Sequence, residues 1–150
     1  MSKRPLLLHR VATLLAGLWA GLLLGLGAIG APAGFAVTTV EIAGRTAGRM
    51  FAIEAYVSLT AAMLLLLLTR QSSPSEPDQP PLPALNTNLL LVLGTLFCTI
   101  AGYFVIQPMM AAARAGEGSL SFGALHGLSA SFFALKGLLV LSLAWRLTSR

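Results

Sequence analysis

The sequence is poor in charge and has one cysteine. Only 10% of its 150 residues are charged, whereas about a quarter are charged in soluble globular domains. Cys98 is the only cysteine, so no disulfide can form within the chain. The composition therefore excludes an ordinary soluble domain and a disulfide-stabilised one.

Signatures of enzymes are also missing. The sequence contains no glycine-rich phosphate loop, no HExxH, no CxxC and no nucleophile elbow. Ser129 follows His126 by three residues, but no oxyanion donors accompany this pair. The net charge of +5 comes from basic residues at the edges of apolar runs, without a dense stripe, so we expect no nucleic-acid partner. No catalytic residue is predicted.

Long apolar runs are the dominant feature. The chain is 56% hydrophobic with a mean hydropathy of +0.82, and a membrane span takes about 20 apolar residues. Four runs are long enough: 11–37, 50–69, 89–110 and 122–145. They predict an all-α polytopic membrane protein with a single domain, a four-helix up-down bundle embedded in a lipid bilayer.

The connections between these runs differ in character. Segment 70–88 contains five prolines with polar and acidic residues, which predicts a flexible loop. In segment 38–49, Glu41, Arg45 and Arg49 recur at intervals of four, which is typical of a charged helical stripe. This segment is expected to lie at the membrane interface or to extend the second span.

The distribution of basic residues predicts the orientation. Six basic residues lie in 3–10, 70 and 146–150, against three in 45–49 and 114. The positive-inside rule then places both termini in the cytoplasm, and the expected location is a bacterial inner membrane. A cleaved signal peptide is the alternative for the N-terminus, although the uncharged run is longer than a typical signal core.

Small residues at helical spacing predict close helix packing. Gly17, Gly21 and Gly25 form a small-xxx-small stripe on the first span, and Gly94, Cys98 and Gly102 repeat the spacing on the third. We expect the first and third helices to pack through these faces, with Cys98 as a small packing residue. A dimer interface on the first span is the alternative.

Charged residues within the spans are the candidate functional residues, because a charge at the bilayer centre is unfavourable by about 2.5–3.5 kcal/mol. Lys136 lies deep in the fourth run and either extends toward the headgroups or is buried. Glu54 and His126 are predicted at equal depth near the non-cytoplasmic end, where they can pair. His126, Ser129, Phe133 and Lys136 share one helical face, which we expect to point inward.

A polar cluster at that end of the bundle is the predicted site. Its expected members are Arg49, Glu54, Gln107, His126, Ser129 and Lys136.

Three stretches resemble a known family: "AGRMFAIEAYVSL" in the second run, "IQPMMAAAR" at the end of the third, and "FGALHGLSASFFALKG" in the fourth. They are similar to the transmembrane protein 205-like family, whose bacterial members are catalogued as a domain of unknown function of the DUF4149 type. The resemblance implies a four-span membrane protein and brings no agreed activity. A looser likeness links the chain to copper-resistance D-type proteins and four-helix protoporphyrinogen oxidases, but fold-level analogy does not transfer a site.

Three functions follow from these residues. The first is a structural or accessory membrane subunit, in a homo-oligomer or a membrane complex, whose polar groups pair with each other. The second is a module for copper or for haem or another tetrapyrrole, with His126 and the thioethers of Met50, Met109 or Met110 as ligands. The third is a small-solute or proton transporter component that uses Glu54, His126 and Lys136.

Overall fold

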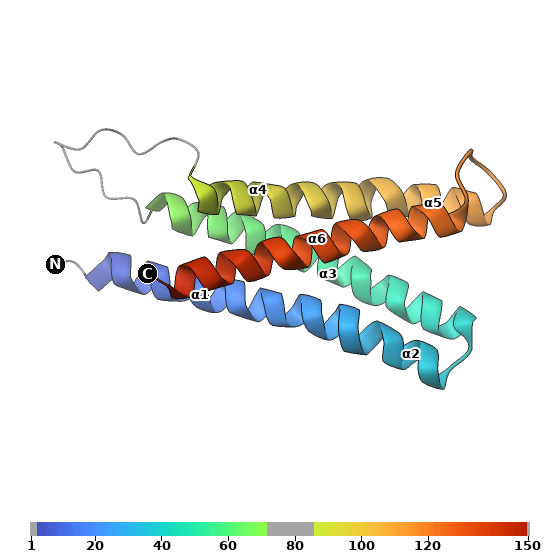
Figure 1. Ribbon diagram of the computed structural model, residues 1–150, viewed down its shortest axis with the longest axis horizontal. Helices are drawn as coiled ribbons and strands as arrows, with labels where there is room; N and C mark the ends of the chain where they lie inside the picture. The colour runs from blue at the N-terminus through green and yellow to red at the C-terminus, as the bar shows by residue number, and fades with distance from the viewer. Residues whose placement is uncertain (1–2, 72–85, 150) are drawn as a thin grey trace.

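The computed structural model describes residues 3–71 and 86–149, and these residues contain helices and no strand (Figure 1). Four helical segments are long and apolar enough to cross a membrane: Leu6–Val37, Val40–Thr69, Thr87–Arg114 and Phe122–Thr148. The predicted all-α fold with four spans is confirmed. Most of the predicted loop 70–88 lies outside the described residues.

The first two spans form one long hairpin. α1 (Lys3–Leu24), the π-helical segment η1 (Gly25–Gly30) and α2 (Ala31–Val37) make up the first span. α3 (Val40–Gln71) begins after two connecting residues. Segment 38–49 therefore extends the second span, which was one of the two predicted arrangements.

The last two spans form the second hairpin. α4 (Thr87–Thr99), the π-helical segment η2 (Ile100–Val105) and α5 (Ile106–Arg114) make up the third span, and α6 (Phe122–Thr148) is the fourth. The side chain of Asn86 caps α4 by accepting from the backbone N–H of Leu89 at 2.8 Å. The turn before α6 uses Gly116 and Gly118 at φ of 79° and 94°, a backbone conformation that glycine adopts without a steric penalty.

The four spans form a ring around one axis. α3 contacts α1 and α4, and α6 contacts the same two helices, so α1 lies diagonally across from α4 and α3 across from α6. Neighbouring helices are antiparallel, and both termini lie at the same end of the bundle (Figure 1). The expectation that the first and third spans pack together is therefore corrected, because α3 and α6 lie between them.

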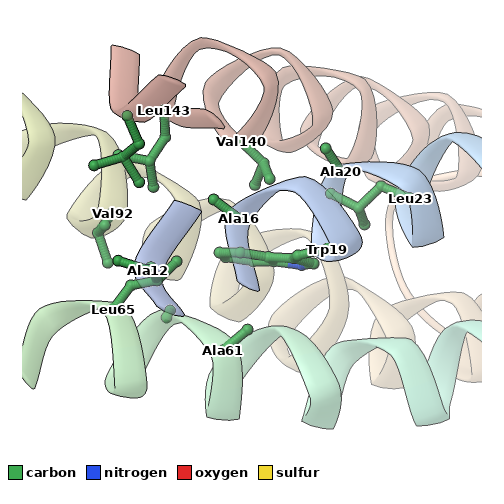
Figure 2. Close-up of a cluster of buried hydrophobic side chains, with 12 residues drawn as sticks. Ala12, Ala16, Trp19, Ala20, Leu23, Ala61, Leu65, Val92, Val140 and Leu143 are labelled. Atoms are coloured by element: carbon green, nitrogen blue, oxygen red, sulfur yellow. The ribbon is translucent and has the colours of Figure 1, made fainter. Parts of the chain in front are cut away.

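The main apolar core lies in the half of the bundle near the termini, since its members on α1 fall at 12–23 and those on α6 at 140–147. Figure 2 shows its side chains. All four spans contribute to it, and five of its buried residues are alanines. The buried members are Ala12, Ala16, Trp19, Ala20, Leu23, Ala61, Ala62, Leu65, Val92, Val140, Leu143 and Leu147. Alanines at intervals of four allow α1 to approach its neighbours closely. The inward small face of α1 is thus built from alanine.

The glycines of the two predicted stripes have different surroundings. A Cβ added at Gly17, Gly21 or Gly25 would meet no atom within 4 Å, so this stripe does not pack inside the bundle. A Cβ at Gly94 would lie 3.0 Å from Leu139, and one at Gly102 would lie 2.6 Å from the Cβ of Phe132. Of the two predicted stripes, only the one on the third span packs inside the bundle, and its partner is α6.

Candidate functional site

Two charged side chains meet at the centre of the bundle. Glu54 is the fourteenth residue after Val40, where α3 begins, and Lys136 is the fourteenth after Phe122, where α6 begins. At a rise of 1.5 Å per residue, both lie about 21 Å from the ends of their helices. Because α3 and α6 are parallel and diagonal in the ring, equal depth brings the two side chains together across the axis.

Lys136 and Glu54 form a buried salt bridge with both carboxylate oxygens engaged. Lys136 Nζ donates to Glu54 Oε1 at 2.7 Å and to Oε2 at 2.8 Å. The two residues are each 3% exposed. Lys136 does not extend toward the headgroups, so of the two predicted arrangements the structure has the buried one.

Ser58 and Trp19 complete the arrangement, which we call the central network (Trp19, Glu54, Ser58 and Lys136). The hydroxyl of Ser58, one turn after Glu54, donates to Glu54 Oε1. The same hydroxyl accepts from Trp19 Nε1 at 2.9 Å and from Lys136 Nζ at 3.4 Å. The network therefore links α1, α3 and α6.

The central network is electrically neutral and internally satisfied. A positive and a negative side chain cancel, which removes most of the penalty of placing each charge alone in a bilayer. Among the side chains that the structure describes, at 6–69 and 86–149, every buried nitrogen or oxygen has a hydrogen-bond partner. Removing one member of such a pair is strongly destabilising, by about 3–5 kcal/mol, because the other charge is left buried and alone.

The predicted pairing of Glu54 with His126 is corrected by this geometry. That expectation counted the depth of Glu54 from Arg49, at the edge of the apolar run, whereas α3 begins at Val40. Glu54 therefore lies deeper than the apolar run suggested, at the level of Lys136. His126 lies ten residues before Lys136 on α6, so about 15 Å separates the two along the helix.

The other predicted cluster members are spread over the half of the bundle away from the termini. Ser129 Oγ donates to the backbone oxygen of Gly102 at 2.8 Å, which joins α6 to η2. His126 is exposed and its ring stacks on Phe122, with centroids 5.8 Å apart. Gln107 is half-buried on α5, and Arg49 is exposed on α3. Of the six predicted members of the polar cluster, only Glu54 and Lys136 therefore contact each other.

The proposed metal ligands differ in burial. Met110 is buried in a small apolar core with Ile106 and Leu125, whereas Met109 and His126 are exposed. Among the described residues, no group of three or more His, Cys, Asp or Glu side chains is arranged to hold a metal ion.

Sequence reasoning missed Ser58 and Trp19. Ser58 had a usable signal, because a serine four residues after an intramembrane glutamate lies on the same helical face. Trp19 lies in an uncharged run, and nothing in its spacing indicates that its N–H points inward. Its partner is 39 positions away in the sequence.

The chain matches a protein-family model. The family model described as a domain of unknown function (DUF4149) matches residues 14–119, well over half of the chain. This range covers most of the first span and all of the second and third, Glu54 and Ser58 included, and ends before α6. No curated protein and no solved structure matches the chain. The chain belongs to the DUF4149 family.

Proposed function

We propose that the protein is a small structural or accessory subunit of a bacterial inner membrane. The observation that carries this proposal is the central network, in which the charged groups inside the spans satisfy one another. Glu54 accepts from Lys136 and Ser58, and Ser58 accepts from Trp19. An arrangement closed in this way holds three helices in register, which is the task of a scaffold.

The outer surface supports association with another membrane span. Gly17 and Gly21 are exposed on α1 with open space where a Cβ would lie, next to the exposed side chains of Leu14 and Leu18. Glycine at this spacing permits close approach of a second helix in a bilayer. The partner is a second copy of this chain or another subunit, and the basic residues at 3–10 and 146–150 support cytoplasmic termini.

The likeness to the transmembrane protein 205-like family belongs to this proposal as well. Its support is the order of motifs along the chain, with Gln107-Pro108 in α5 and His126 to Ser129 at the start of α6. In the structure, Ser129 of this motif binds the backbone of Gly102, a packing role that agrees with a structural protein.

The proposal is tested by native mass spectrometry of the protein extracted from its own membrane in a mild detergent. We expect an assembly of fixed stoichiometry, either a homo-oligomer or a complex with another integral membrane chain. The same assembly is expected for the double variant Glu54→Leu/Lys136→Met, because two apolar side chains of similar volume replace a buried pair with little loss of stability.

Two results would contradict a structural role. One is a chain that is monomeric in every mild detergent at its native expression level. The other is a double variant that folds and inserts normally but fails to complement deletion of the gene, since that outcome requires the charges themselves.

A further inference from the structure

The ion pair is enclosed differently toward the two ends of the bundle. Toward the termini it is followed by the main apolar core, to which α6 contributes Val140, Leu143 and Leu147 over about 10 Å of helix. Toward the other end the packing divides into two hairpins, in which α2 contacts α3 and α5 contacts α6 (Figure 1). None of the seven residues of α2 is buried, and the buried residues of α5 form a separate small core with α6.

One aromatic pair covers the ion pair on this divergent side. Phe51 and Phe133 each precede their charged neighbour, Glu54 or Lys136, by three residues. Their ring centroids are 5.1 Å apart in an edge-to-face arrangement, so they bridge α3 and α6 one turn from the salt bridge. Lys136 Nζ lies 5.1 Å from the centroid of the Phe133 ring. Both phenylalanines are only half-buried.

The same level of the bundle contains both π-helical segments. A Cβ at Gly27 of η1 would lie 2.8 Å from the Phe133 ring, and one at Gly102 of η2 would lie 2.6 Å from the Cβ of Phe132. Single-turn π segments are frequent at functional sites and at kinks, where the helical hydrogen-bond ladder is interrupted. The two segments lie where α2 and α5 leave the common bundle, which makes them the natural hinges.

We propose that Phe51 and Phe133 form a gate through which water reaches the Glu54–Lys136 pair from the end opposite the termini, and from that end only. Separation of the α2–α3 and α5–α6 hairpins at the π segments moves the two rings apart. The main core keeps the other path closed, because several turns of apolar side chains lie between the pair and the termini. The central network is then a site with one-sided access as well as a structural element, which goes beyond the proposed scaffold role.

The single native cysteine provides the probe. Cys98 is buried on α4, sixteen residues before Arg114 at the end of α5, or about 24 Å from that end and so near the depth of the ion pair. Right-side-out and inside-out vesicles would be treated with 2-(trimethylammonium)ethyl methanethiosulfonate, which is charged and does not cross membranes. The labelling rate of Cys98 is compared in the native chain and in Phe133→Ala.

We expect Phe133→Ala to raise the labelling rate by at least about tenfold, because thiol reactivity follows access to water and reagent. The increase should occur only when the reagent is on the side opposite the termini. Phe97→Ala is the matched control: Phe97 also pairs with a neighbouring ring, that of Phe132, but it is exposed on the outer surface. This control should leave the rate near that of the native chain.

Three outcomes would overturn the gate: no increase in Phe133→Ala, an equal increase from both sides, or the same increase in Phe97→Ala. If Phe133→Ala fails to fold, Phe51→Leu opens the same contact with a smaller change and is judged by the same criteria. The labelling rate measures the access of reagent to Cys98 and does not depend on association with another chain. A failure of the gate proposal is therefore distinguishable from a failure of the proposed scaffold role.

Discussion

Ser58 is the residue on which the central network depends. A serine hydroxyl has one donor and two acceptor positions, and all three are used here: it donates to Glu54 and accepts from Trp19 and Lys136. The carboxylate of Glu54 already accepts directly from the Lys136 ammonium through both oxygens, whereas the Trp19 N–H donates to Ser58. The hydroxyl therefore converts a two-residue salt bridge into a link among three helices.

The hydrogen bonds of Ser58 predict an order of stability among variants. Ser58→Ala removes a bond to Glu54 and leaves the buried N–H of Trp19 without its acceptor, a loss of about 1–3 kcal/mol. Trp19→Phe removes one bond and its donor together, and such interhelical bonds average about 0.6 kcal/mol in membranes. Both losses are measured by SDS titration in mixed micelles, with far-ultraviolet circular dichroism as the signal. A Ser58→Ala variant that is no less stable than Trp19→Phe would contradict the role given to the hydroxyl.

At the scale of elements, glycines separate into those that permit helix contact and those that do not. Gly102 lies where α6 approaches η2, and the Cβ of Phe132 leaves no room for a methyl group. Gly21 lies on α1 with open space around it. The two positions look alike in the sequence, since each belongs to a small-xxx-small stripe.

A matched pair of alanine substitutions distinguishes them. Gly102→Ala should destabilise the bundle by about 1–3 kcal/mol, because the added methyl group forces α6 away from η2 and weakens the Ser129 bond. Gly21→Ala should stabilise it by up to about 1 kcal/mol, through higher helix propensity. The same SDS titration measures both changes. Equal effects at the two positions would mean that the contact between Gly102 and Phe132 does not limit the packing.

Helix ends explain why the sequence predicted the spans well and the site less well. Apolar run length identified four spans, because the bilayer sets the length of each run. The same rule does not show where the second helix begins, since α3 continues from the apolar run through the charged turns at Glu41, Arg45 and Arg49 to Val40. That difference of about three turns moved Glu54 from the level of His126 to that of Lys136.

The order of the helices around the ring could not be predicted from the sequence either. Four short-linked spans can be arranged with more than one set of neighbours, and small-residue spacing on two spans does not show that they face one another. The alanines at 12, 16 and 20 form an equally regular stripe, and it is this one that packs inside. The composition alone does not separate a glycine face toward lipid from an alanine face toward the core.

At the scale of the whole molecule, the up-down ring places both termini at one end and the α2–α3 and α5–α6 turns at the other (Figure 1). The diagonal helices α3 and α6 run in the same direction, which is why residues at equal distances from their starts meet at the axis. The position of both termini at one end and the pairing of Glu54 with Lys136 thus both follow from the up-down order of the four helices.

This topology is tested by epitope insertion. A tag at the C-terminus and one at the N-terminus should be accessible from the same side of the membrane, and a tag between Gly116 and Gly118 from the opposite side. Antibody binding to intact and to permeabilised cells gives the sides. Opposite sides for the two termini would require an odd number of spans and would contradict the bundle.

The central claim, that Glu54 and Lys136 are stable inside the bundle because each neutralises the other, is tested most directly by a double-mutant cycle. The free energy of unfolding is measured by SDS titration for the native chain, Glu54→Leu, Lys136→Met and the double variant. Each single variant should lose about 3–5 kcal/mol, because it leaves a buried charge alone, and the double variant should recover most of that loss. Losses that add within about 0.5 kcal/mol would show that the two charges do not interact, and would contradict the account.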